Sequence, residues 1–285
     1  LGTLKDNLIL EFNEDEFLSH SISLNENETI NSIDNLPDWL VYNQNSGLVS
    51  GTPSNSDVGS VELKLHVTST SGSQREETVV IEVNNVNDAP VFDFTPPSST
   101  SEDVEFSYQL TASDIDANVV NETLTYTGLN TPGWLSVSSS GLLTGTPTNN
   151  DVGTHSITVQ VADGSGATDT RTFSLTVNNV NDPPTLEEIP DTSINEESSF
   201  SYQLTARDID VGDALSFSEV NLPSWLSLSQ TGLLSGTPDD PNVGTHSVTV
   251  QVADSSGVTH TRTFSLTVNN VNDAPVFDFT PPSST

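Results

Sequence analysis

Carboxylate side chains recur at matching positions along this sequence. Two D-x-D pairs, in "SDID" and "RDID", are each followed later by an aspartate in "VADGSG" or "VADSSG". Alternate residues of an extended segment point to one side, so a D-x-D pair presents both carboxylates together. Hard oxygen ligands in this pattern suit Ca²⁺, which takes about six to eight of them. The residues are Asp114, Asp116 and Asp163, and Asp208, Asp210 and Asp254.

A polar phrase, "NNVND", occurs three times, and Glu102 and Glu196 precede the first long strands expected after the first two copies. Asp and Asn form turns readily, so one isolated D-x-D would favour a plain loop. Recurrence of the whole set favours calcium ligands instead. The phrase supplies Asn85, Asn87 and Asp88 at the first copy (joint one), Asn179, Asn181 and Asp182 at the second (joint two), and Asn270, Asn272 and Asp273 at the third.

The chain is built from tandem repeats of about ninety residues. Tryptophan recurs at Trp39, Trp134 and Trp225, in the phrases "LPDWL", "TPGWL" and "LPSWL". "SGLVSGTP", "SGLLTGTP" or "TGLLSGTP" follows each of them. Self-similarity at a fixed period indicates a repeat architecture. The predicted boundaries are 1–88, 89–182 and 183–273, with 274–285 as the start of a further repeat, so we expect the chain to be a piece of a longer protein.

Within a repeat the hydrophobic period is two. "SITVQVAD" and "TFSLTVNNV" alternate apolar and polar residues, which is typical of half-buried antiparallel strands. Turn phrases such as "GTPTNN" and "DGSG" separate such stretches. About seven short strands per repeat predict an all-β fold of tandem immunoglobulin-like sandwiches. Loops gather at the two ends of a sandwich, so the D-x-D pair should lie beside the preceding joint and the early glutamate beside the next.

Charge and composition exclude several classes of protein. Forty Asp and Glu face six Lys and Arg, for a formal net charge of −34. Nucleic acid and anionic membranes need clustered cations, so neither is an expected partner. Without cysteine there are no disulfides and no thiolate metal sites. No apolar run is long enough to predict membrane insertion, and no Ser-His-Asp order or H-E-x-x-H motif indicates an enzyme.

"NVNDAPVF" resembles the cadherin linker, and "SDID" and "VADGSG" resemble the cadherin D-x-D and later loop. "LPSWLSLSQTGLLSGTP" resembles the dystroglycan-type cadherin-like repeat, also called the putative-Ig repeat of bacterial surface proteins. The resemblance covers essentially the whole chain and implies a calcium-rigidified extracellular rod. It implies ligands at joint one from Glu14, Asn85, Asn87, Asp88, Asp114, Asp116 and Asp163, and at joint two from Glu102, Asn179, Asn181, Asp182, Asp208, Asp210 and Asp254. The third copy has Glu196, Asn270, Asn272 and Asp273 but no later repeat in this sequence to complete it.

The sequence departs from the cadherin pattern in three ways. The cadherin linker begins with Asp where Asn85 and Asn179 stand, so each joint loses a charge. The middle "LDRE" is missing; at its position Asn55 and Asp57, or Asn149 and Asp151, either replace its acids or form a plain turn. Repeat 1 has "NENE" (Glu26, Glu28) in place of the D-x-D and Ser69 in place of the later Asp, which predicts a weak or absent site there.

These patterns predict a stiff calcium-dependent extender of a large, secreted or surface-anchored adhesin, most consistent with a bacterial source. The expected partners are neighbouring repeats, with other adhesin chains or a polysaccharide as further candidates. The alternative is a calcium-dependent carbohydrate-binding module, in which an exposed Trp stacks on sugar. Tryptophan in "P-x-W-L" ahead of a strand is more often a core residue, which favours the structural hypothesis.

Overall fold

A computed structural model describes residues 8–117 and 123–277. Of the predicted start of a further repeat, 274–285, residues 278–285 lie outside the described residues. The described chain is β-structure interrupted by three short 3-10 turns, at Asn55–Asp57, Asn149–Asp151 and Asp240–Asn242. The predicted all-β tandem sandwiches are confirmed. Among the described residues there is no helix with the length and apolarity to cross a membrane.

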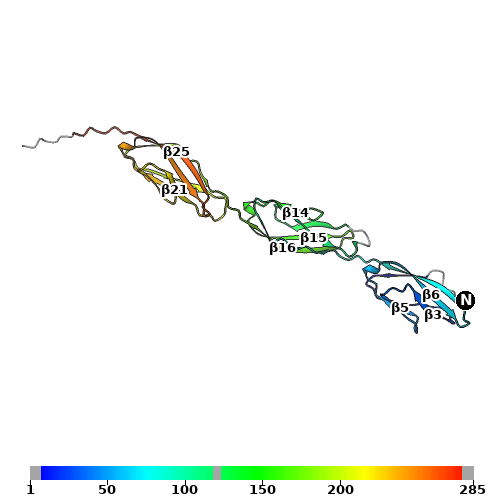
Figure 1. The fold of residues 1–285 in the computed structure, drawn as a ribbon. Helices are drawn as coiled ribbons and strands as arrows, with labels where there is room; N and C mark the ends of the chain where they lie inside the picture. The colour runs from blue at the N-terminus through cyan, green and yellow to red at the C-terminus, as the bar shows by residue number, and fades with distance from the viewer. Residues whose placement is uncertain (1–7, 118–122, 278–285) are drawn as a thin grey trace, which may run out of the picture. The chain divides into compact units, whose positions relative to one another are not determined.

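Repeat 1 consists of two facing sheets (Figure 1). The larger has the order β1-β7-β6-β3 and the smaller the order β2-β5-β4. Strand β1 pairs in parallel with β7, whereas β2 with β5, β4 with β5, β3 with β6 and β6 with β7 are antiparallel pairs. The strands are β1 Leu8–Asn13, β2 Leu18–Ser21, β3 Glu28–Asp34, β4 Leu40–Asn43, β5 Leu48–Gly51, β6 Gly59–Ser69 and β7 Gln74–Asn84.

Repeat 2 has the same plan with one additional strand pair. Its sheets have the orders β12-β15-β16-β9 and β10-β14-β13, and β8 pairs with β11. The strands are β8 Val91–Phe92, β9 Ser99–Ser101, β10 Phe106–Gln109, β11 Ala112–Ser113, β12 Thr125–Asn130, β13 Leu135–Val137, β14 Leu142–Gly145, β15 Gly153–Ala162 and β16 Thr168–Asn178.

Repeat 3 matches repeat 2 strand for strand. Its sheets are β18-β25-β24-β21 and β19-β23-β22, with β17 paired to β20. The strands are β17 Thr185–Leu186, β18 Thr192–Asn195, β19 Phe200–Gln203, β20 Ala206–Arg207, β21 Ser216–Asn221, β22 Leu226–Leu228, β23 Leu233–Gly236, β24 Gly244–Ala253 and β25 Thr259–Asn269. As in repeat 1, the first strand of the large sheet, β18, runs parallel to the last, β25.

Each repeat has its own apolar core, which follows directly from the alternation in its long strands. In β15, Ile157, Val159 and Val161 are fully buried and the intervening residues are not. The three tryptophans are partly buried and pack against the core of their own repeats. The rings of Phe106 and Trp134 meet edge to face at 6.1 Å. The tryptophans therefore belong to the cores, as predicted, rather than to an exposed sugar platform.

The chain divides into two compact units. One contains repeat 1 and most of repeat 2; the other contains repeat 3 together with Ser101–Asp103, Thr148–Gly153 and residues 177–182 of repeat 2. All residues of joint one fall inside the first unit and all residues of joint two inside the second. The geometry of each joint is therefore described within a single unit.

Candidate metal centres

A buried glutamate follows the first strand of the large sheet in every repeat. Glu14, Glu102 and Glu196 are 1%, 0% and 3% exposed. One oxygen of each accepts the backbone amide of the linker valine, Val86, Val180 or Val271, at 2.6 Å. The other oxygen of each is buried without a hydrogen-bond partner among the described residues. These glutamates thus lie against the following linker, as the sequence predicts, each with one oxygen directed at no partner.

The D-x-D pairs approach the linkers from the following repeat. Asp116 and Asp210 are 0% and 6% exposed, and one oxygen of each accepts the amide of Asp88 or Asp182 at 2.7 and 2.8 Å. The first aspartate of each pair closes a turn, since Asp114 accepts the amide of Asp116 at 2.9 Å. The same aspartates therefore close a turn with one oxygen and leave the other oxygen available to a ligand. The free, buried oxygens are Asp114 Oδ2, Asp116 Oδ1, Asp208 Oδ2 and Asp210 Oδ1.

The later aspartates tie a loop to the linker. One oxygen of Asp163 accepts loop amides, including that of Ala167 at 2.8 Å, and the other accepts the side-chain amide of Asn87 at 2.7 Å. Asp254 holds Val258 and Asn181 in the same way, both at 2.8 Å. The side-chain amides of Asn87 and Asn181, with the loop amides, lower the pKa of Asp163 and Asp254 below the ordinary value. Both aspartates are therefore ionised anchors of the linker at neutral pH.

The linker residues are not equivalent at the three copies. Asn85 is half-buried and its side-chain oxygen is buried without a partner, whereas Asn179 and Asn270 are exposed. Asn87, Asn181 and Asn272 each donate to the backbone carbonyl of the next aspartate, at 2.9, 3.0 and 3.1 Å. Asp88 and Asp182 are half-buried and Asp273 is exposed. Of the three asparagines at this first linker position, only Asn85 has a buried oxygen with no partner among the described residues.

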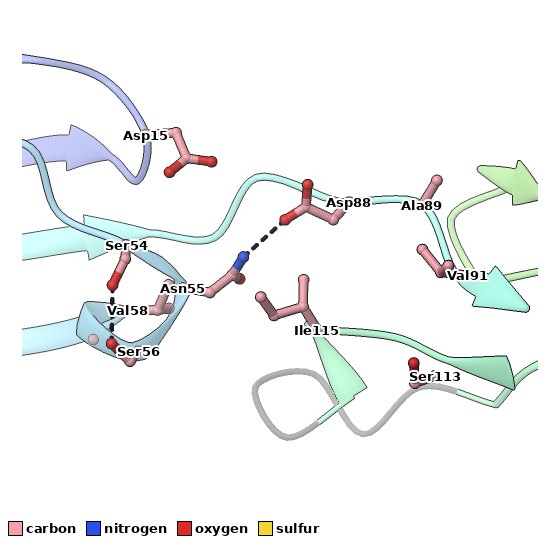
Figure 2. Close-up of a pocket in the computed structure, with 11 residues that line it drawn as sticks. Asp15, Ser54, Asn55, Ser56, Val58, Asp88, Ala89, Val91, Ser113 and Ile115 are labelled. Atoms are coloured by element: carbon pink, nitrogen blue, oxygen red, sulfur yellow. Dashed lines mark hydrogen bonds between the residues drawn. The ribbon is translucent and has the colours of Figure 1, made fainter. Parts of the chain in front are cut away.

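The residues at the position of the missing "LDRE" divide into two roles. Asp57 and Asp151 close their own 3-10 turns by accepting the amides of Ser54 and Thr148 at 2.9 and 2.8 Å. Asn55 and Asn149 instead reach the linker, donating to Asp88 and Asp182 at 2.8 and 2.7 Å (Figure 2). Asn55 Oδ1 is buried without a partner. Asp57 and Asp151 therefore form plain turns, whereas Asn55 and Asn149 contact the linkers and belong to the joints.

The end of repeat 3 carries an additional acid. Asp240 occupies the turn position that Asn55 and Asn149 occupy in the earlier repeats. The Val271 amide lowers the pKa of Glu196, but burial and the adjacent Asp240 and Asp273 carboxylates raise it above its ordinary value overall. Three carboxylates thus meet at this end, and none of them forms a salt bridge with a described residue.

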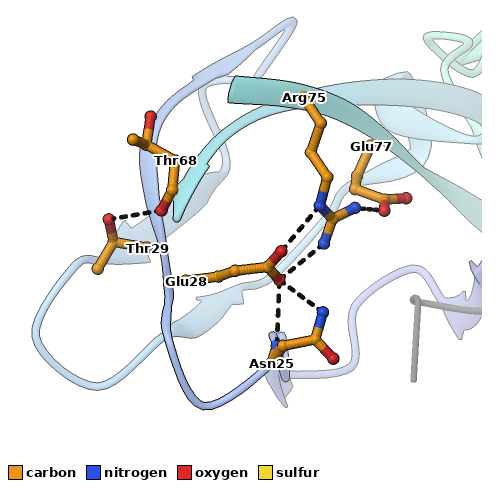
Figure 3. A network of polar contacts seen from close by, with 6 residues as sticks. All are labelled: Asn25, Glu28, Thr29, Thr68, Arg75 and Glu77. Atoms are coloured by element: carbon orange, nitrogen blue, oxygen red, sulfur yellow. Dashed lines mark hydrogen bonds and ion pairs between the residues drawn. The ribbon is translucent and has the colours of Figure 1, made fainter. Parts of the chain in front are cut away.

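At the opposite end of repeat 1 a cationic side chain, Arg75, lies among carboxylates. Arg75 binds Glu28 through Nε and Nη2 at 3.0 and 2.8 Å and also contacts Glu77 (Figure 3). The Arg75 guanidinium lowers the pKa of Glu28 from 4.5 to about 2. Glu26 is exposed, and the Ser69 hydroxyl forms hydrogen bonds with Ser71 and with the amide of Ser73 in its own turn. The guanidinium thus stands among carboxylates at this end, where it supplies positive charge. The weak or absent metal site at this end stays a prediction.

We expect Arg75→Gln to destabilise repeat 1 at neutral pH. A carboxyl whose folded pKa is depressed stabilises the fold above its unfolded pKa, so this contribution should be lost as the pH falls from 4.5 towards about 2. The difference between wild type and variant should therefore shrink over that range. Calorimetric unfolding at several pH values measures it, with Lys64→Gln, an exposed residue of the neighbouring strand β6, as the charge-matched control. Equal stability of Arg75→Gln and wild type at pH 7 would contradict the role of this ion pair.

The buried oxygens without hydrogen-bond partners gather at the joints, and no salt bridge of the described residues reaches them. At joint one they belong to Glu14, Asn55, Asn85, Asp114 and Asp116. Burial raises the pKa of Glu14, and the nearby Asp116 carboxylate raises it further, although the Val86 amide partly offsets both. A buried anion is costly unless it is paired or binds a metal. Carboxylate and amide oxygens are the ligands that Ca²⁺ prefers, so this donor set fits that ion.

Comparison with known proteins gives the same picture of the repeats. A family model described as "Putative Ig domain" matches residues 14–84, 89–178 and 183–269. The "Serine-rich adhesin for platelets" of Staphylococcus aureus is 33% identical over 169 residues, which is 58% of this chain and 7% of that protein. The chain therefore spans a small fraction of this relative's length.

Solved cadherin structures share the fold. Protocadherin Gamma B2 extracellular cadherin domains 1–5 superpose with a TM-score of 0.65 at 16% identity, covering 95% of this chain and 60% of that one. Mouse Cadherin-23 EC22–24 gives a TM-score of 0.57 at 15% identity, covering 93% and 96%. This chain is thus a tandem-repeat region that resembles adhesin repeats in sequence and cadherin extracellular domains in fold.

Proposed function

We propose that the joints of this chain, which belongs to the "Putative Ig domain" family, bind calcium. Bound calcium would fix successive repeats into a stiff extender. The observation that carries the proposal is that buried carboxylate oxygens with no hydrogen-bond partner among the described residues recur at both joints. At joint one these come from Glu14 in repeat 1 and from Asp114 and Asp116 in repeat 2, so one ion would bridge two repeats. Joint two repeats the set with Glu102, Asp208 and Asp210.

The remaining predicted residues would hold the linker in position around the ions. Asp163 and Asp254 bind Asn87 and Asn181, and Asp88 and Asp182 bind Asn55 and Asn149. An extended Asn-Val-Asn-Asp segment is thereby held between two sandwiches before any ion arrives. The calcium ion would supply the positive charge that these carboxylates lack. We propose that the predicted asparagines and linker aspartates supply the remaining oxygen ligands of the ion.

The extender would belong to a large adhesin on the outside of a cell. Two observations support this: the similarity to a staphylococcal adhesin and the fold shared with cadherin extracellular domains. The net charge of −34 supports it as well, because such a chain gains from the calcium of an external medium. The dystroglycan-type identity of the repeat, a bacterial source and direct adhesion by this region belong to the same proposal.

Small-angle scattering of the chain should depend on calcium. In millimolar calcium, which suits extracellular sites with a Kd of roughly 0.1–1 mM, we expect a longer maximum dimension and a narrower distribution of conformations than in EDTA. When the ion is removed, the like charges that face each other across each joint repel. The joint then no longer holds successive repeats at one fixed angle. Restoring calcium after EDTA should recover the original profile. A profile that is identical in calcium and in EDTA would contradict the extender.

A carbohydrate-binding module receives less support. Trp39, Trp134 and Trp225 pack against the cores, and the large exposed aromatic residues among those described are Phe17 and Phe277. Sequence and structure therefore offer no aromatic strip for stacking on sugar in the described chain. A pull-down on insoluble polysaccharides with and without chelator separates the two functions.

A further inference from the structure

A third aspartate in repeat 3 lies beside the D-x-D pair of joint two. Oxygens of Asp208, Asp210 and Asp213 all lie within 4.8 Å of one another. Calcium binds oxygen at about 2.3–2.6 Å, so two ligands on opposite sides of one ion are up to about 5 Å apart. The three carboxylates are therefore spaced to share a single ion. Comparing the repeats does not reveal Asp213, because the phrase "VGD" that contains it follows the D-x-D pair of joint two and does not follow that of joint one.

The local backbone brings Asp213 back to the pair. Gly212 has a φ of +97°, a conformation that L residues rarely adopt, and the turn returns the amide of Asp213 to the carbonyl of Asp210 at 3.3 Å. The Asp213 carboxylate accepts the hydroxyl of Ser255 from the loop between β24 and β25. The side chain is thereby held between two loops of repeat 3, on the same side as Asp210.

Each member of the trio has an oxygen that nothing in the described chain satisfies. Asp208 Oδ2, Asp210 Oδ1 and Asp213 Oδ2 are buried and have no hydrogen-bond partner, and the Asp210 side chain is more than nine-tenths buried. The cationic residue next to the trio in sequence, Arg207, is paired with Glu187 at 3.1 Å. Three carboxylates so close together need a cation, since otherwise their mutual repulsion opposes folding.

We propose that Asp213 is a third carboxylate ligand of a calcium ion that Asp208 and Asp210 hold within repeat 3, and that this ion is separate from the ion that would bridge Glu102 and the D-x-D pair across joint two. The inference rests on the proposed calcium binding at the joints. This ion differs from a bridging ion because all three carboxylates that bind it come from one short loop of repeat 3. The ion should therefore remain bound when the contribution of repeat 2, Glu102, is removed.

Calcium titration of the full chain against a competing chelator tests the proposal. Asp213→Asn should weaken one calcium by about tenfold, since affinity follows the number of ligand charges, and leave the other ions as in wild type. Asp213→Glu keeps the carboxylate and should recover most of that loss. Glu219→Gln, an exposed charge on β21 of the same repeat, is the matched control and should bind calcium as wild type does. Glu102→Gln should leave this ion in place.

The outcomes separate this inference from the proposed function. If Asp210→Asn loses an ion while Asp213→Asn titrates as wild type, the joint binds calcium and the role of Asp213 is wrong. If Glu102→Gln abolishes the same ion as Asp213→Asn, the ion is shared and not intrinsic to repeat 3. If neither Asp210→Asn nor Asp116→Asn alters binding, the joint proposal itself fails. Melting of each variant in chelator reports folding, and Asp213→Asn should be at least as stable there as wild type.

Discussion

In saturating calcium, Asp116→Asn is expected to lower the melting temperature of the first two repeats, and in EDTA the same substitution is expected to raise it. The sign reverses because Asp116 is fully buried and lies near Glu14. Without an ion its charge repels Glu14 and its free oxygen finds no partner. With an ion it is a ligand, and ligand at about a hundred times its Kd contributes roughly 2.7 kcal/mol per site.

Asp210→Asn should show the same reversal at joint two and leave joint one unchanged. Each variant keeps the linker contact, because an asparagine oxygen can accept the amide of Asp88 or Asp182 as the carboxylate does. The measurement is calorimetric unfolding in calcium and in EDTA, together with the number of ions bound. Loss of calcium at both joints from one substitution, or at neither, would show that the residues are assigned wrongly.

Gly145→Ala is expected to cost about 3 kcal/mol or more and to unfold repeat 2 first, because inserted core atoms with no room are strongly destabilising. A Cβ at Gly145 would lie 1.9 Å from the backbone carbonyl oxygen of Trp134 and 3.1 Å from its indole ring. Backbone atoms cannot move aside as a flexible side chain can. The two other glycines of the "GTP" phrases, Gly51 and Gly236, meet the same obstacle at 1.9 and 2.2 Å.

Gly133→Ala is the matched control for this prediction. It lies immediately before Trp134 and is exposed, and an added Cβ would meet no atom within 4 Å. Its stability should stay within about 0.5 kcal/mol of wild type, as for ordinary surface substitutions. Urea unfolding of both variants in the same calcium concentration gives the comparison. Similar midpoints for Gly145→Ala and wild type would mean that the "GTP" turn does not need its glycine.

The fold could be predicted from the sequence because two-residue alternation and recurring turn phrases act at short range. The strands β15 and β16 lie where "SITVQVAD" and "TFSLTVNNV" indicate. The parallel pairing of β1 with β7 and of β18 with β25 could not be predicted in this way. It joins the two ends of a repeat, and the local sequence carries no signal of such a distant partner.

The candidate site could be predicted in outline and not in detail. Recurrence in register is enough to single out the D-x-D pairs and the glutamates, which the structure places beside the linkers. Asn55, Asn149 and Asp213 were not separated from ordinary turn residues, because Asx side chains in loops look alike until the chain is folded. The sequence signal for Asp213 is a carboxylate three residues after a D-x-D with a glycine between them.

The parallel pairing of first and last strands determines how a repeat carries mechanical load. In repeat 1 the register joins Leu8 to Val79 and Asn13 to Asn84, so chain entry and chain exit lie at opposite ends of one strand pair. Tension along the chain pulls β1 and β7 in opposite directions along their length. The backbone hydrogen bonds between them are then sheared together rather than peeled apart one by one. Repeat 1 thus has a mechanical clamp between the point where the chain enters and the point where it leaves.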